Sequence, residues 1–328
     1  MIKQVLKYLY LGAGLTILVW VVAETDIAEV LRRIAELGWL GLLFILGLYF
    51  IAFFVDSITW LLTLESANLT FRWGFRVFIV RLAGEAFNNL LPGATMGGEP
   101  LKALMIKEKY GISLNEGSAS LVLAKTLNLI ALVLFLLIGV FLVTGTSLLS
   151  SEAKFMSHVG LCVLITGTII LFCVQRFGFS SRLGVWLASF SNSNKPKVFL
   201  KQVEEIDSRF KRFYSSHRTR VLVAIILAFL NWTLGVAEVY FAMNFVGYPI
   251  EWSDAWIIEA AAQMVRAAVF FIPAGIGAQE GVFLFLSAAM TGNPSLGLAI
   301  AVIRRVREIT WIAIGVAIAF LFSNSQKE

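Results

Sequence analysis

Charged side chains are scarce in this chain of 328 residues, since Asp, Glu, Lys and Arg make up only 15% of it. A typical soluble protein has about a quarter. Hydrophobic residues make up 59%, and several apolar runs reach the roughly 20 residues with which an α-helix crosses a bilayer. The composition excludes an ordinary soluble domain and predicts an all-α polytopic membrane protein.

Cysteine and histidine are almost absent, with two of each, and this limits the available chemistry. Cys162 and Cys173 fall on one expected helix about 16 Å apart, at about 1.5 Å per residue, which is too far for a disulfide. His158 and His217 have no ligand cluster around them, so we expect no metal site. No G-x-x-x-x-G-K-[ST] loop occurs, so no ATP site is visible and we expect no cofactor.

Proline is rare as well, and three of the six prolines fall in two glycine-rich breaks, PGATMGGEP at 92–100 and PAGIGAQEG at 273–281. At membrane depth, freed backbone groups need protein or water as partners, and a carboxylate costs roughly 2.5–3.5 kcal/mol. The first break alone is compatible with a loop outside the membrane or with a polar site within it. The expected hinge or break positions are Pro92, Gly97, Gly98, Pro100, Pro273, Gly275, Gly277 and Gly281.

The two breaks belong to a larger repeated pattern. Three residues recur 181 positions later, where Pro92, Glu99 and Gly111 return as Pro273, Glu280 and Gly292. Two further pairs agree with this displacement within two residues, Trp73 with Trp252 and Lys125 with Arg305. The shared order of Trp, Pro, Glu, Gly and a cation predicts an internal duplication.

The apolar runs divide the chain into segments. Residues 1–37 hold a first span, retained because no A-x-A cleavage site follows it, and an interfacial amphipathic helix. Residues 38–144 form a first repeat, whose expected elements are 39–64, 75–91, 99–110 and 117–144. The two middle elements are shorter than the ~30 Å hydrocarbon core at about 1.5 Å per residue, which suggests a re-entrant hairpin.

The second half repeats this arrangement after a connector. Residues 145–220 hold a connecting span, 155–175, and a basic insert. Residues 221–322 form the second repeat, with elements 221–245, 255–272, 280–291 and 295–322, followed by a short tail at 323–328. Whether 255–272 spans fully stays open. The chain is therefore expected to have about six full spans plus two re-entrant or broken-helix hairpins.

The insert contains one amphipathic helix, expected at 196–216. Its apolar stripe comprises Phe199, Val203, Ile206, Phe210 and Phe213. We expect this stripe to rest on the membrane surface, with the nearby cations facing anionic head groups. Those cations are Lys201, Lys211 and Arg212.

The distribution of charge predicts the topology. Lys and Arg are frequent at the N-terminus, at 66–76 and in the insert, whereas the loops near 26–37, 145–154 and 247–254 have an acidic surplus. The positive-inside rule then predicts a plasma membrane protein with both termini on the cytoplasmic side. The net charge of +6 reflects this asymmetry, so we expect no nucleic-acid partner. An odd number of spans between the repeats would invert them, as in many transporters.

The paired Pro–Gly–Glu motifs carry a resemblance that covers about 39–322. PGATMGGEP with Gly111 and 118–125, and PAGIGAQEG with 299–305, are similar to the transmembrane region of lysylphosphatidylglycerol synthases, a family that includes free-standing flippase-like proteins. The resemblance implies lipid movement between leaflets. Lys125 departs from the arginine expected there, and lysine lacks bidentate phosphate binding. The synthases' soluble domain has no counterpart in 323–328, so no transferase activity is expected.

The candidate transport site consists of ionisable residues at membrane depth. Cations would bind a lipid phosphate, because arginine donates two parallel hydrogen bonds to it, while Glu99 or Glu280 would carry a proton. Both carboxylates could instead only cap their helices. Among three neighbouring arginines we choose Arg305 for the interior and place Arg304 and Arg307 at the rim. The set is Glu85, Asn88, Asn89, Glu99, Lys102, Lys125, Arg266, Glu280 and Arg305.

Several members of this set have alternative roles. Glu85 and Arg266 stand seven residues before Pro92 and Pro273, and could form a cross-repeat ion pair. The two asparagines could bind a head group or satisfy backbone freed at the first break. Asp56 is either a buried acid or a residue near the end of its span.

These observations predict a lipid translocase that moves an anionic phospholipid or a polyprenyl-linked head group, with or without proton coupling. The first alternative is an ion-coupled small-solute transporter, which would need no lateral opening to lipid. An intramembrane enzyme of lipid metabolism would need a nucleophile or metal beside the carboxylates. An accessory subunit would leave the midplane charges unexplained. The lipid, the direction of transport, the energy source and the oligomeric state remain open.

Overall fold

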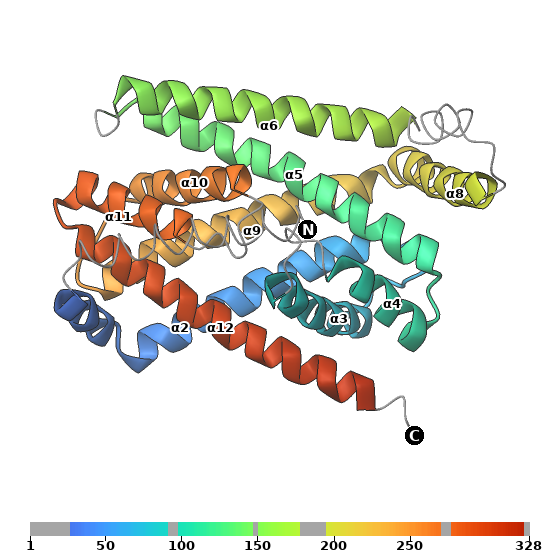
Figure 1. Cartoon of the computed structure of the whole chain (residues 1–328), viewed down its shortest axis with the longest axis horizontal. Coiled ribbons are helices and arrows are strands. Elements are labelled where there is room, and N and C mark those ends of the chain that lie inside the picture. Colours follow the sequence, from blue (N-terminus) through green and yellow to red (C-terminus); the bar gives the residue numbers. More distant parts are fainter. Residues whose placement is uncertain (1–26, 91–97, 147–149, 178–194, 270–276, 325–328) are drawn as a thin grey trace.

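The computed structural model describes residues 27–90, 98–146, 150–177, 195–269 and 277–324, and within these ranges it contains ten helices and no strand (Figure 1). The expected all-α class is confirmed. The first span expected within 1–37, the tail 325–328 and four of the eight break positions lie outside the described residues. Those break positions are Pro92, Gly97, Pro273 and Gly275.

The first half contains four helices at nearly the expected places. They are α2 (Ile27–Thr63), α3 (Phe71–Leu90), α4 (Glu99–Tyr110) and α5 (Leu114–Thr144). Gly38 adopts φ 62° and kinks α2, so the expected amphipathic helix and second span are two arms of one element. The Ser113 side chain caps α5 by accepting from the Glu116 N–H.

Six helices follow in the rest of the chain. They are α6 (Ser151–Phe177), α8 (Lys195–Ser216), α9 (Arg218–Phe245), α10 (Trp252–Ala268), α11 (Ala278–Thr291) and α12 (Pro294–Asn324). The expected element at 255–272 therefore starts three residues earlier, at Trp252, and its helix ends at Ala268.

Four of the described helices are long and apolar enough to cross a membrane, namely those within 31–63, 114–144, 151–177 and 218–245. The span expected at 295–322 corresponds to the helix α12, which is not one of these four and carries four charged residues between Arg304 and Glu308. Large apolar side chains such as Phe141, Phe155 and Phe320 are 65–76% exposed on the outside. This exterior suits lipid contact.

Helices α2–α5 and α9–α12 contact one another in corresponding pairs. The contacts of α3 with α12 and of α2 with α12 have counterparts in those of α10 with α5 and of α9 with α5, and α2 contacts α9 directly. In Figure 1, α11 lies at the left end of the molecule and α4 lies right of its centre, and α5 and α12 run in opposite directions. This pairing of contacts is the one that the predicted duplication would give.

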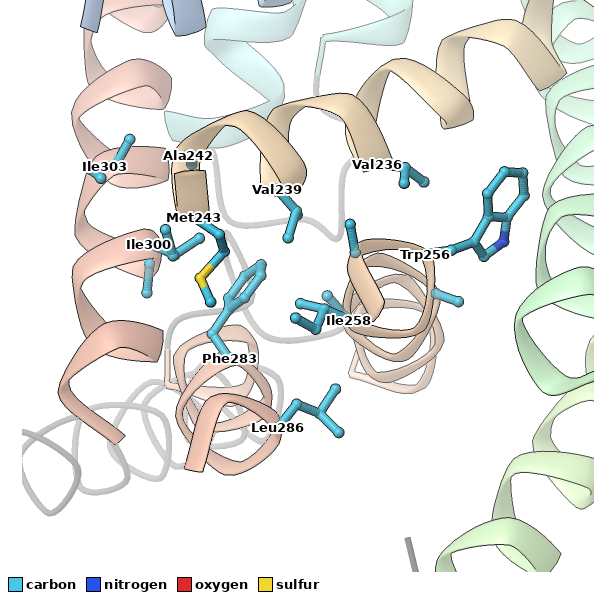
Figure 2. Close-up of a cluster of buried hydrophobic side chains, with 14 of the residues drawn as sticks. Val236, Val239, Ala242, Met243, Trp256, Ile258, Phe283, Leu286, Ile300 and Ile303 are labelled. Atoms are coloured by element: carbon cyan, nitrogen blue, oxygen red, sulfur yellow. The ribbon is translucent and has the colours of Figure 1, made fainter. Parts of the chain in front are cut away.

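One extensive hydrophobic core is built mainly from the second half, with contributions from α2, α5 and α6. Side chains of α9, α10, α11 and α12 meet there, among them Met243, Ile258, Phe283 and Ile300 (Figure 2). A smaller core around Trp60, Val77 and Ile106 joins α2, α3 and α4. These two cores hold the short helices α4 and α11 against their long neighbours, and so position the first turn of each.

Helix α8 corrects one expectation from the sequence. Phe210 and Phe213 are 5% and 0% exposed, in a cluster with Leu62, Leu123 and Leu127 of α2 and α5. The stripe is therefore covered by protein over this part, and the expected membrane-surface placement is wrong there, because an amphipathic pattern does not distinguish a lipid surface from a protein groove. Lys211 and Arg212 do remain exposed. The side chains of Phe199, Lys201 and Val203 lie outside the description.

Candidate binding cavity

A cavity of about 530 Å³ lies among α2, α3, α4, α5, α9, α10 and α12. Six acidic and six basic side chains line it, although the helices around it have apolar outer faces. Unpaired charges in such surroundings are costly, so ion pairing should be extensive. The lining charges are Asp56, Glu85, Glu99, Glu238, Glu259, Glu308, Arg81, Lys102, Lys125, Arg266, Arg304 and Arg307.

Helices α3, α4 and α5 bring the first group of these charges together. Lys102 donates to Glu85 at 2.5 Å and to Glu99 at 3.0 Å, and the Nζ of Lys125 lies 3.0 Å from Glu99. Lys102 is almost fully buried, whereas the Lys125 side chain is 48% exposed. Lys125 is thus the more accessible of the two cations on Glu99.

A second acid belongs to the same group. Asp56 of α2 pairs with Arg81 of α3, and Asn128 of α5 donates to it at 3.4 Å. Its side chain is 15% exposed and lines the cavity. Of the two sequence interpretations, the buried acid is the one that the geometry supports.

Close approach of α3 and α4 positions Lys102. A Cβ on Gly98 would lie 1.9 Å from the Gly84 carbonyl oxygen, and a Cβ on Gly84 would lie 2.3 Å from Lys102 Cγ. Asn88 fixes this junction, since its Oδ1 accepts from the Gly98 N–H at 2.6 Å and its amide group donates to Glu85 and Glu99. Asn88 therefore satisfies backbone at the break, as one sequence interpretation proposed. The side chain of Asn89 lies outside the described residues.

The second group of charges lies on α9, α10 and α12. Arg304 pairs with Glu259 and lies 3.5 Å from Glu238, while Arg307 pairs with Glu238 and lies 3.6 Å from Glu308. Both arginines are 5% exposed. Gln263 supports this group by donating to Glu259 at 2.7 Å.

Arg305 is separated from the cavity, which reverses the expectation for these arginines. Its side chain contacts Glu280 at 2.6 Å and Glu308 at 2.8 Å in a small neighbouring pocket, and it is absent from the lining of the large one. Residues three apart share a helix face, whereas adjacent residues diverge by about 100°. Arg304 and Arg307 therefore face the interior together and Arg305 does not.

Glu280 has a structural task as well as an ionic one. Its Oε2 accepts from the Gly277 N–H at 2.8 Å, three residues before it, so it caps α11. Its Oε1 accepts a hydrogen bond from the Nε of Arg305. The capping alternative thus holds for Glu280. Glu99 makes no such cap in α4.

The two Pro–Gly–Glu motifs form corresponding ion pairs. Glu99 in the first turn of α4 meets Lys125 of α5, and Glu280 in the first turn of α11 meets Arg305 of α12. The first pair lines the large cavity and the second lies outside it. Two equivalent positions therefore differ in access.

The cross-repeat ion pair proposed between Glu85 and Arg266 is not formed. Glu85 contacts Lys102 of its own repeat. Arg266 lines the cavity without an ion pair or hydrogen bond to any described residue. The two positions are related by the duplication, and they do not contact each other across it.

Sequence reasoning missed four charges of this site, namely Arg81, Glu238, Glu259 and Glu308. A signal existed for each acid, because Glu238 and Glu259 are isolated carboxylates in apolar segments, and an intramembrane acid marks a functional site. The i,i+3 and i,i+4 spacing of Arg304, Arg307 and Glu308 also identifies one polar face on α12.

Comparison with known proteins identifies the family. Residues 5–317 match the model of the lysylphosphatidylglycerol synthase TM region. The chain belongs to this family. The resemblance seen in the paired breaks is confirmed, and membership makes the chain an integral membrane protein without indicating a catalytic activity.

Three similar proteins are described as UPF0104 membrane proteins. One from Methanothermobacter thermautotrophicus is 24% identical over 330 residues, covering 96% of this chain and 94% of its own. One from Pyrococcus horikoshii is 22% identical over 312 residues, covering 92% of each chain. No solved structure matches. Within the described residues, no group of three or more His, Cys, Asp or Glu side chains could hold a metal ion.

Proposed function

We propose that this family member is a lipid translocase, which moves the head group of an anionic phospholipid or polyprenyl-linked lipid through the central cavity while the acyl tails stay in the bilayer. The observation that carries the proposal is the charged cavity of about 530 Å³ inside helices with apolar exteriors. Such a site offers a head group a polar path across a region where an exposed charge is unfavourable.

The difference between the two repeats supports movement by alternating access. If the repeats are inverted, the accessible pair Glu99–Lys125 and the enclosed pair Glu280–Arg305 lie toward opposite membrane faces. Rocking of one repeat against the other would then open the second pair and close the first. With both termini in the cytoplasm, as the positive-inside rule favours, the accessible pair belongs to the cytoplasmic side.

Charge balance supports coupling to a proton. The cavity lining contains as many acidic as basic side chains, so an added anion leaves net negative charge in a region of low dielectric constant. We assign the compensating proton to Glu99, whose Oε2 is buried and accepts no hydrogen bond from the described residues. Glu280 would take the same role in the opposite state.

Leaflet exchange in proteoliposomes tests this function. Fluorescent phosphatidylglycerol and a polyprenyl-phosphate analogue would be compared in vesicles with the native chain, with Glu99→Gln, with Glu280→Gln and with Arg305→Ala. We expect fast exchange with the native chain and a loss of about tenfold or more in each variant, with folding checked by thermal unfolding. Exchange no faster than in empty vesicles, for both lipids and with an imposed proton gradient, would overturn the proposal in favour of a small-solute transporter.

A further inference from the structure

Arg266 lies in the last turn of α10 and differs from the other cations of the cavity. Six cations line the cavity, and five of them lie within 4.0 Å of a carboxylate. Arg266 is the exception among the described residues. A guanidinium that lines a polar cavity with no described carboxylate within 4.0 Å is available to a ligand.

The duplication explains why this cation has no partner. At a displacement of 181 residues, Glu85 corresponds to Arg266 and Lys102 corresponds to Phe283. In the first repeat, Glu85 and Lys102 neutralise each other at 2.5 Å. In the second repeat, Arg266 stands in place of the acid and Phe283 in place of the lysine. The ion pair between these two positions is therefore lost.

The acids of the second repeat are engaged elsewhere. Glu308, whose charge interacts with that of Arg266 at longer range, is contacted by Arg305 at 2.8 Å and by Arg307 at 3.6 Å. Glu259 forms an ion pair with Arg304 and accepts a hydrogen bond from Gln263. No acid among the described residues therefore supplies Arg266 with a counter-charge at short range.

A cation in the last turn also interacts favourably with the helix dipole, by roughly 0.3–1 kcal/mol at an exposed site. That interaction does not require the side chain to line a cavity, and an exposed position would satisfy it at lower desolvation cost.

We propose that Arg266 is the phosphate-binding residue of the cavity. Its planar fork matches two phosphate oxygens, and a single unpaired cation fits a phosphate with one negative charge, as in a phosphodiester. This assignment rests on the proposed function, since it concerns the same cavity.

Ligand-dependent thermal unfolding of the purified full-length chain tests the assignment without requiring transport. The probes are a short-chain phosphatidylglycerol, inorganic phosphate and a short-chain diacylglycerol, each titrated into the native chain, Arg266→Gln, Arg266→Lys and the control Arg72→Gln. Arg72 is exposed at the start of α3 and lies outside the cavity lining. Stabilisation that grows with ligand concentration reports the affinity.

We expect phosphatidylglycerol to bind the native chain and the Arg72 variant equally, and to bind Arg266→Gln about tenfold or more weakly, with partial recovery in Arg266→Lys. Unchanged affinity in Arg266→Gln, or equal stabilisation by diacylglycerol, would overturn the assignment. Stabilisation by inorganic phosphate as strong as by the lipid, and lost in Arg266→Gln, would keep the phosphate site and identify a free solute as its source.

Leaflet exchange by the same variants separates the two proposals. If the native chain exchanges lipid and Arg266→Gln does so equally fast, the translocase function is supported and the role of Arg266 is rejected. Arg266-dependent binding of phosphatidylglycerol without exchange in the native chain leaves the phosphate site standing and removes the translocase.

Discussion

Gly111 and Gly292, 181 residues apart, end α4 and α11 in the same conformation. Their φ angles are 72° and 71°, and each N–H donates to the carbonyl oxygen four residues earlier at 2.9 Å. The left-handed region is accessible to glycine without the Cβ penalty that other residues meet. The sequence showed only that glycine recurs at these two positions. The structure adds that both glycines end a helix with the same backbone conformation, as the predicted duplication would require.

Alanine at either position should destabilise the fold through the backbone alone. A Cβ on Gly111 or Gly292 would meet no atom within 4 Å, so steric contact is excluded and only the left-handed strain of about 1–2 kcal/mol remains. Thermal or denaturant unfolding in detergent would measure it. Gly167→Ala is the control, because this helical glycine also has open space around it and no positive φ. A loss of equal size in the control would contradict the explanation.

The buried pair Glu238–Arg307 should behave differently from an exposed pair. Arg307→Gln should cost about 3–5 kcal/mol, because it removes the closest partner of a buried carboxylate. The double variant with Glu238→Gln should lose less than the sum of the single variants, and a double-mutant cycle measures the difference. The more exposed pair Arg33–Glu36, at 3.2 Å and with side chains 19% and 39% exposed, should show a coupling energy of only about 0.2–1 kcal/mol. Similar couplings for both pairs would argue against burial as the cause.

The two equivalent cations should differ in chemical accessibility. Lys125 is 48% exposed within the cavity lining, whereas the Arg305 side chain is 23% exposed and held by Glu280 and Glu308. In a background with Cys162→Ser and Cys173→Ser, we expect Lys125→Cys to react with a small charged thiol reagent about tenfold faster than Arg305→Cys in the state described. The rates would be followed by mass shift of the protein. Equal reactivity from the same membrane side would contradict the difference in access.

The docking of α8 gives a stability prediction. Phe213 is 0% exposed, so Phe213→Ala should cost about 3–5 kcal/mol. Lys211→Ala on the exposed face should stay within about 0.5 kcal/mol. Both are measured by unfolding in detergent without anionic lipid. If the apolar stripe of α8 contacted only lipid, Phe213→Ala would leave the free energy of unfolding unchanged under these conditions.

Much of the helix order could be predicted from the sequence, because hydrophobic runs and Pro–Gly breaks act locally. The starts of α4, at Glu99, and of α12, near residue 295, were expected within one residue. The number of spans was less predictable. Helix α12 is long but carries its charges where a simple span would be apolar, and those charges are accommodated by carboxylates on α9 and α10 that local hydropathy does not connect to it.

The composition of the site could be predicted in part. Glu99, Lys102, Lys125 and Asn88 come together as expected, since the break brings α3 and α4 into contact. The choice among the three arginines of α12 was wrong because sequence register to Lys125 was followed instead of helix face. The structure shows that Arg305 instead pairs with Glu280, because the helix face decides which side chain reaches the cavity.

By itself, the sequence determined that this chain is a helical membrane protein with a duplicated, charged break, because composition, periodicity and repeated motifs are properties of neighbouring residues. Only the tertiary structure decided which charges neutralise one another. Glu238 and Arg307 are 69 residues apart, and Lys102 meets Glu85 because two glycines let α3 and α4 approach closely. Ion pairing depends on distances of a few ångströms between helices, and for that reason the unpartnered state of Arg266 emerges only when all of them are packed together.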